Sequence, residues 1–209
     1  MARCTKEEAL ATRDRLLDAA ELVFSEKGVS RTSLSDIAES AGASRGAIYW
    51  HFKNKSDLFN AMMDRTSLPL EDALRQDEGG IAQDPLAELQ RGILGAMKKI
   101  ATDERTCRVF EIATLKVEYV DELMAVKARH LQCYVDSVSR MQRWLEDAAI
   151  RQSTPLQMSS AMAAQGLHSL VVGLIHTWLL APASFDLVGV AELAVATYLT
   201  GLGFTPKPV

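Results

Sequence analysis

Cysteine is scarce in this chain, and the three that occur are far apart. The 209 residues contain Cys4, Cys107 and Cys133, and none of them belongs to a C-x-x-C pair. So sparse and odd a set argues against a disulfide framework and for a reducing, cytoplasmic compartment. The charged N-terminal residues include no apolar run, so we expect no secretory signal. For Cys107 and Cys133 two interpretations remain open, redox sensing and burial as small hydrophobic side chains.

Glycine and proline are also few, 12 and 6 residues, and no stretch shows the apolar–polar alternation of a half-buried strand. Apolar residues instead recur every three or four positions, which predicts an all-α protein with about nine helices. Pro69 is expected to kink or end the helix in which it lies. Asp84, Pro85 and Glu88 form the expected capped start of another helix. We expect longer helices at 8–27, 55–75, 85–101, 104–115, 118–150, 155–181 and 187–202, with a loop at 76–83.

Patterns that carry catalysis are missing. The four histidines are scattered, and the chain has no G-x-S-x-G motif and no phosphate-binding loop. His168 and His176 are eight residues apart, which is long for joint metal ligation, and no third ligand completes a set. We therefore expect neither a cofactor nor a metal, and an all-α enzyme is the weakest of the functional alternatives.

Charge is absent from residues 152–185, where no Asp, Glu, Lys or Arg occurs. A membrane span is one interpretation of such a stretch. Polar side chains such as Gln165, His168 and His176 interrupt it, however, and no Lys/Arg cluster flanks it. We favour a buried helix that pairs, together with 187–202, with the same helices of a second copy, and we expect no membrane partner.

The formal net charge of −4 is unlike that of a typical DNA-binding protein. Residues 1–65 nevertheless balance ten Lys or Arg against ten Asp or Glu, so the whole excess of acid lies in residues 66–209. Binding to DNA through so small a basic surface would need two copies on two half-sites, which favours a homodimer.

The chain contains one clear motif, TSLSDIAESAGASRGAIYWHFKNK at residues 32–55. Thr32 or Ser33 can cap a first short helix, and Gly42 can take the positive φ that ends it. Ser44 can cap a second short helix, and Asn54 a longer one that follows. Two helices joined by a short glycine-containing turn predict a helix-turn-helix, whose second helix enters the DNA major groove. Residues 41–56 carry three cations and no carboxylate, which favours contact with phosphate.

The segment RTSLSDIAESAGASRGAIYWHFKNKSDLF closely resembles the DNA-binding segment of TetR-family transcriptional repressors. The portion RGAIYWHFKNKSDLF is similar to the AcrR-like branch, which controls multidrug efflux pumps. The opening residues, the WLLAP stretch and the chain length fit the same branch. The resemblance implies an N-terminal helix-turn-helix domain at 1–54 and a ligand-binding and dimerisation domain at 55–209.

Ten residues are the predicted DNA contacts. Arg45 is expected to read a base, most simply a guanine, and Gly46 lets the backbone approach DNA closely. The resemblance implies that Tyr49 and His51 face phosphates, whereas Trp50 is left open between DNA contact and core. The remaining members are hydroxyl and ammonium groups expected to bind phosphate. The full set is Thr32, Ser33, Ser44, Arg45, Gly46, Tyr49, Trp50, His51, Lys53 and Lys55.

A small-molecule cavity is expected in the larger domain, where a few polar and methionine side chains lie among apolar ones. In the family, Glu111 recurs in the matching segment, and Val172 stands where relatives carry an acid. That difference favours neutral, aromatic or anionic effectors over cationic ones. The predicted set is Met63, Met97, Phe110, Glu111, Thr114, Cys133, Met141, Gln165, His168, Val172 and His176. For each of them an ordinary core position is the alternative.

The sequence thus predicts a repressor that binds double-stranded operator DNA as a homodimer through its last two helices. A hydrophobic small molecule is expected to release it from an operator that controls an efflux operon. A DNA-binding protein without a small-molecule ligand is the principal alternative.

Overall fold

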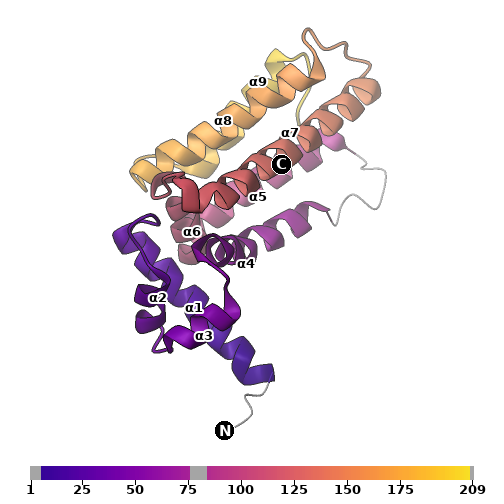
Figure 1. The fold of residues 1–209 in the computed structure, drawn as a ribbon. Coiled ribbons are helices and arrows are strands. Elements are labelled where there is room, and N and C mark those ends of the chain that lie inside the picture. The colour runs from indigo at the N-terminus through magenta and orange to yellow at the C-terminus, as the bar shows by residue number, and fades with distance from the viewer. Residues whose placement is uncertain (1–5, 76–83, 208–209) are drawn as a thin grey trace. The chain divides into compact units, whose positions relative to one another are not determined.

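The computed structural model describes residues 6–75 and 84–207, and for residues 67–75 the backbone alone. These residues form nine α-helices and one short 3-10 helix, without a strand, as the sequence predicts. Figure 1 labels the α-helices along the chain. They are α1 (Lys6–Lys27), α2 (Leu34–Ser40), α3 (Arg45–His51), α4 (Lys55–Arg75), α5 (Pro85–Thr102), α6 (Glu104–Leu115), α7 (Met124–Gln152), α8 (Ser160–Leu180) and α9 (Leu187–Gly201), with the 3-10 helix η2 at Asp121–Leu123.

Contacts divide the chain into two compact units. The first comprises residues 1–67 and 108–130, and the second comprises residues 68–107 and 131–209. Consequently α4, α6 and α7 each begin in one unit and end in the other. The predicted domains, 1–54 and 55–209, are defined by function, DNA binding and ligand binding, and not by contacts. That division stays a prediction.

One apolar cluster holds the first unit together. Phe24 of α1, Ile48 of α3 and Phe59 of α4 are fully buried in it, and the rings of Phe24 and Phe59 lie 6.0 Å apart. Val109 and Ile112 of α6 belong to the same cluster. The core of the first unit therefore includes residues of α4 and α6 as well as of the three N-terminal helices.

Local capping fixes where the short helices begin. The side chain of Ser33 accepts a hydrogen bond from the Asp36 amide, and the Asp36 carboxylate accepts one in return from the Ser33 amide. Ser44 caps α3 by accepting from the Ala47 amide at 3.1 Å. Gly42 has φ +61°, the left-handed conformation expected where α2 ends. The predicted caps are confirmed, and for α2 the cap is Ser33 rather than Thr32.

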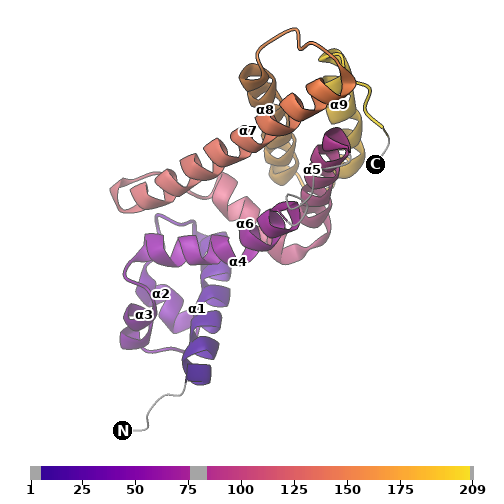
Figure 2. The same cartoon turned by 90° about the vertical axis from the view of Figure 1, so that its right-hand side faces the viewer.

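In the second unit, α9 packs against both α5 and α8. Figures 1 and 2 both show α8 and α9 side by side. Close approach is possible because Gly166 has no side chain: a Cβ there would lie 2.3 Å from the Tyr198 hydroxyl oxygen. That hydroxyl donates to the Ala163 carbonyl at 2.8 Å, which fixes the contact between the two helices.

Helix ends differ from the expected ones at three places. α8 begins at Ser160, with Ser159 as its cap, so Thr154-Pro155 does not start it. α7 begins at Met124, after η2 at Asp121–Leu123, rather than near 118. α4 continues past Pro69 to Arg75, so the proline does not end it. The predicted loop at 76–83 lies outside the described residues.

The expected capping box of α5 was also wrong. Asp84 is the N-cap, and it accepts from the Ala87 amide at 3.2 Å. Glu88 therefore lies one residue beyond the capping-box position, and its carboxylate pairs with Arg91 instead.

Candidate DNA interface and effector-binding residues

The outer face of α3 is the candidate DNA-reading surface. Ile48 anchors this seven-residue helix in the core, and its other long side chains project outward. Tyr49 is half exposed and Trp50 is 73% exposed. Trp50 therefore does not belong to the core, which was one of the two interpretations open for it. An exposed indole on a recognition helix is available to a DNA groove.

Arg45 lies at the N-terminal end of this surface, where recognition helices contact base edges. Its guanidinium carbon lies 5.8 Å from the centre of the Tyr49 ring, and both side chains are exposed. Gly46, between them in sequence, is exposed as well. The helix thus presents a cation and a phenol side by side.

His51 is the last residue of α3, and its imidazole ring is uncharged. Burial lowers the pKa of this imidazole, and the nearby Arg13 lowers it further. Because the ordinary value is already below 7, the ring is neutral at physiological pH. A neutral imidazole can still donate one N–H to a phosphate oxygen. Its ring meets that of Trp50 edge-on at 4.6 Å.

Three of the predicted phosphate contacts, Ser33, Ser44 and Lys53, lie on the surface around α3. Ser33 and Ser44 are exposed, although both hydroxyls already cap helices. Lys53 is exposed, and its backbone amide donates to the Asp57 carboxylate at 3.0 Å. The side chain of Lys53 is thus at the surface, and its contact with a phosphate stays a prediction.

Two predicted phosphate contacts are inside the protein, and for them the prediction was wrong. Thr32 is 2% exposed, and its hydroxyl donates to the Gly28 carbonyl at 2.8 Å. Lys55 is 8% exposed, and its ammonium group contacts the carbonyls of Ser30 and Thr32 and the carboxylate of Glu122. A hydroxyl and a cation close in sequence to the recognition helix indicated phosphate contacts. The sequence gives no sign that the fold buries both side chains.

The predicted effector-binding residues are divided between the two units. Met63, Phe110, Glu111 and Thr114 belong to the first, and the other seven belong to the second. Met63 is part of the apolar cluster of the first unit. The carboxylate of Glu111 pairs with Lys116 at 2.9 Å, so it is not a free charge for a cationic ligand.

The predicted effector-binding residues also differ in how far their side chains are exposed. Met97 and Met141 are buried, and Phe110, Cys133, Gln165 and His168 are half-buried. The side chains of Thr114, Val172 and His176 are exposed in the protomer, and their part in effector binding stays a prediction.

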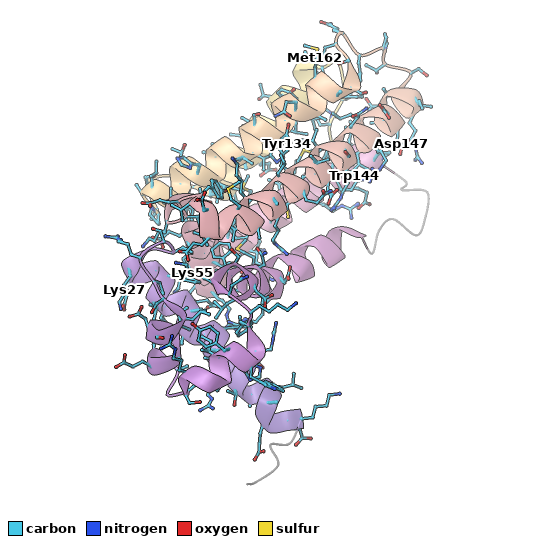
Figure 3. All side chains as sticks on the ribbon, viewed as in Figure 1. Lys27, Lys55, Tyr134, Trp144, Asp147 and Met162 are labelled. Atoms are coloured by element: carbon cyan, nitrogen blue, oxygen red, sulfur yellow. The ribbon has the colours of Figure 1, made fainter. Side chains whose placement is uncertain are left out.

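A polar cluster joins α7 to α8 and includes two of the predicted residues. The Tyr134 hydroxyl donates to the side-chain oxygen of Gln165, whose amide nitrogen donates to Ser169 at 3.2 Å. The rings of Tyr134 and His168 meet edge-on at 5.2 Å, and burial lowers the pKa of His168, so this ring too is neutral. Figure 3 labels Tyr134 on α7. Sequence reasoning missed Tyr134, because its spacing alone does not distinguish it from the apolar residues of the same helix.

The face formed by α8 and α9 is apolar and exposed. Met162 (labelled in Figure 3), Val172 and Leu180 project from α8, and Leu193 projects from α9. A groove of about 500 Å³ runs between the helices, lined by Leu170, Val190, Leu193, Ala194, Thr197 and Tyr198. By length and composition, α8 is the single helix of the described chain that could cross a membrane, and one such helix is weak evidence for a span.

Within residues 6–75 and 84–207 no group of three or more His, Cys, Asp or Glu side chains could hold a metal ion.

Comparison with known proteins covers almost the whole chain. Residues 16–62 match the family described as bacterial regulatory proteins, tetR family. Residues 84–204 match the family described as MAATS-type transcriptional repressor, C-terminal region. The HTH-type transcriptional regulator TtgR of Pseudomonas putida is 37% identical over 206 residues, which cover 99% of this chain and 98% of TtgR.

Two solved structures have a similar fold and sequence. NalD, the secondary repressor of the MexAB-OprM multidrug efflux pump in Pseudomonas aeruginosa, gives a TM-score of 0.84 at 34% identity, over 94% of this chain and 98% of its own. The complex of SmeT with triclosan gives a TM-score of 0.80 at 32% identity, over 95% and 99%. SmeT is the repressor of the Stenotrophomonas maltophilia multidrug efflux pump SmeDEF.

Proposed function

The chain belongs to the TetR family of bacterial transcriptional regulators, and we propose that it is a cytoplasmic repressor whose operator binding is relieved by a small hydrophobic molecule. The observation that carries this proposal is the outer face of α3, where Arg45, Tyr49 and Trp50 are exposed together. A recognition helix needs such a face, since its side chains must reach base edges. Arg45 is proposed to read a guanine, and Lys53 to hold a phosphate.

The regulated genes are proposed to encode a multidrug efflux pump. NalD and SmeT repress such pumps, and each is more than 30% identical to this chain over nearly its full length. The similarity extends through residues 84–204, beyond the helix-turn-helix. It therefore includes the part of the chain that would sense the compounds a pump exports.

We propose that the active form is a homodimer paired through α8 and α9. Leu193 is 73% exposed in the protomer, and Met162 and Leu180 project from the same pair of helices. Covering such a face with a second copy removes apolar surface from water at about 25 cal/mol per Å². Pairing also supplies the second recognition helix that a two-half-site operator requires.

The effector is proposed to be a neutral or anionic aromatic compound. Glu111 is already paired with Lys116, so it offers no free negative charge to a cation. The pKa of His168 is lowered by burial, so its ring offers a hydrogen-bonding group rather than a charge. Tyr134, Gln165 and His168 can exchange hydrogen bonds with a phenolic hydroxyl. Triclosan, the compound bound to SmeT, is a suitable first probe.

A gel-shift assay with the intergenic DNA beside the coding sequence tests the repressor function. We expect a protein–DNA complex of reduced mobility, and we expect increasing concentrations of triclosan to dissociate it. A complex that survives every apolar compound tested would instead identify a DNA-binding protein without an effector. Absence of a complex at low salt would refute the proposal.

Calorimetric titration tests the chemistry of the effector. We expect triclosan to bind and a cationic dye such as ethidium to bind weakly. Tyr134→Phe, which removes one hydroxyl, should weaken triclosan binding, whereas the matched control Tyr198→Phe should not. Tight binding of the dye without binding of the phenol would contradict the proposed preference.

A further inference from the structure

The ammonium group of Lys55 has no hydrogen left for a phosphate. An ammonium group has three N–H donors. In the first unit, Lys55 Nζ lies 3.0 Å from the Ser30 carbonyl, 2.9 Å from the Thr32 carbonyl and 2.5 Å from Glu122 Oε1. Three acceptors satisfy three donors, and the side chain is 8% exposed. Figure 3 labels Lys55, the first residue of α4.

Glu122 belongs to a short stretch that joins α6 to α7, residues 116–122, here called the connecting segment. The Ser56 hydroxyl donates to the Glu122 carbonyl at 2.6 Å, so the first two residues of α4 both bind this one residue. Ser30 donates to the Glu118 carboxylate at 3.1 Å. The connecting segment is therefore bonded to the start of α4 and to the turn between α1 and α2.

The other end of the connecting segment holds the end of α1. The Val29 amide donates to the Lys116 carbonyl at 3.0 Å, and Lys116 Nζ donates to the Ser25 carbonyl at 2.5 Å. Just beyond Glu122, Leu123 and Val126 are buried in the apolar cluster of the first unit. The connecting segment is thus fixed to a rigid core while its polar groups hold the turn that leads into α2.

We propose that Lys55 is a positioning residue for DNA binding. With Glu122 it holds the Ser30–Thr32 turn, and this turn sets the direction in which α2, and through it α3, leaves α1. Operator affinity then depends on the Lys55–Glu122 pair although neither side chain touches DNA. Because α6 and α7 both continue into the second unit, the connecting segment is also one of the covalent connections between this turn and the second unit, as is α4. The inference rests on the proposed DNA-binding function.

Phosphate contact and positioning differ in their dependence on salt. Each phosphate contact contributes about 0.9 to the slope of log affinity against log salt concentration. Loss of one contact in each protomer of a dimer should therefore lower the slope by about 2. A residue that only positions the recognition helix changes the affinity and leaves the slope as it is.

The experiment compares Lys55→Met, Glu122→Gln and the control Lys53→Met by fluorescence anisotropy with the intergenic DNA, across a series of salt concentrations. We expect Lys53→Met to lower the slope. We expect Glu122→Gln and Lys55→Met to weaken binding by up to about fivefold for each pair lost, without a change in slope. The double variant should be no weaker than Lys55→Met alone, and Glu122→Asp, which keeps the charge, should recover most of the affinity. A lowered slope for Lys55→Met with no effect of Glu122→Gln would overturn the proposal.

Hydrogen exchange gives a readout that needs no DNA. The amides of Val29 and Thr32, which donate to the Lys116 and Val29 carbonyls, should exchange faster in Glu122→Gln than in the wild type. Equal exchange rates would overturn the positioning role even if DNA binding is intact. Failure of the wild type to bind DNA would refute the proposed function. Faster amide exchange in Glu122→Gln would even then support the proposal that Glu122 stabilises the Ser30–Thr32 turn. Because Glu122 is at the surface, its variants test the pair even if Lys55→Met does not fold.

Discussion

Replacing Arg65 with methionine is expected to destabilise the first unit, because it removes the cation that donates a hydrogen bond to the buried carboxylate of Glu21. Glu21 lies on the inner face of α1 and is 2% exposed. Arg65 of α4 donates to it, and the same guanidinium group contacts Asp18 at 2.8 Å. Arg108 of α6 lies 3.9 Å from the other Glu21 oxygen, which is too far for a hydrogen bond. The pair therefore links α1 to α4, and Arg108 adds a weaker attraction.

The magnitude follows from the burial of the acid. Removing one partner of a buried ion pair costs about 3–5 kcal/mol, because the other charge stays buried and uncompensated. The side chain of Arg65 is 21% accessible and Arg108 remains, so we expect the lower end, about 3 kcal/mol. Replacing both members, as in Glu21→Leu with Arg65→Met, removes the buried carboxylate together with its cation. That double variant should regain most of the loss.

Urea denaturation followed by circular dichroism measures the effect, at one fixed protein concentration because a dimer gains stability with concentration. Arg91→Met, at an exposed ion pair of α5, is the matched control and should change the free energy of unfolding by less than about 1 kcal/mol. If Arg65→Met cost no more than this control, or if the double variant were as unstable as the single one, the buried-charge reasoning would be refuted.

Two further predictions concern a helix cap and a helix contact. Hydrogen bonds from Ser33 and the nearby Lys27 lower the pKa of Asp36, so its stabilising effect is present above the unfolded value and is lost as the pH falls through the folded value. The stability difference between wild type and Asp36→Asn should therefore be constant from pH 7 to about pH 4 and shrink in stronger acid, as thermal unfolding would show. Gly166→Ala should cost about 1–3 kcal/mol, since its methyl group overlaps the Tyr198 hydroxyl, and adding Tyr198→Phe should recover part of the loss in the same assay. Unchanged stability of Gly166→Ala would contradict the close contact.

Local sequence chemistry predicted most of the helix boundaries. Ser33, Ser44 and Asn54 are capping residues by type, and each caps the helix that follows it. Apolar residues at helical spacing are a signal of the same local kind, and Phe24 and Ile48, which follow it, are buried in the core. Such signals depend on neighbours within one or two turns, which a sequence displays directly.

Long-range contacts could not be predicted in the same way. Nothing near Lys55 in sequence indicates Glu122, which lies 67 positions further along the chain, so a cation beside a recognition helix was assigned to phosphate. The Thr32 hydroxyl bonds locally, to the Gly28 carbonyl four residues earlier, and Thr32 was misassigned because its burial depends on how the fold covers the turn. Val172 and His176 were placed in a cavity because a helix without charges has no obvious outer face.

Equilibrium binding of the purified protein to the intergenic DNA beside its coding sequence tests the central claim most directly, with sedimentation to count the protomers in the complex. We predict a complex that contains two protomers. Arg45→Ala should lose about 1–3 kcal/mol of binding free energy on this DNA and much less on random DNA of equal length. A monomer bound to DNA, no binding at low salt, or equal losses on both DNAs would contradict a paired recognition helix read through Arg45.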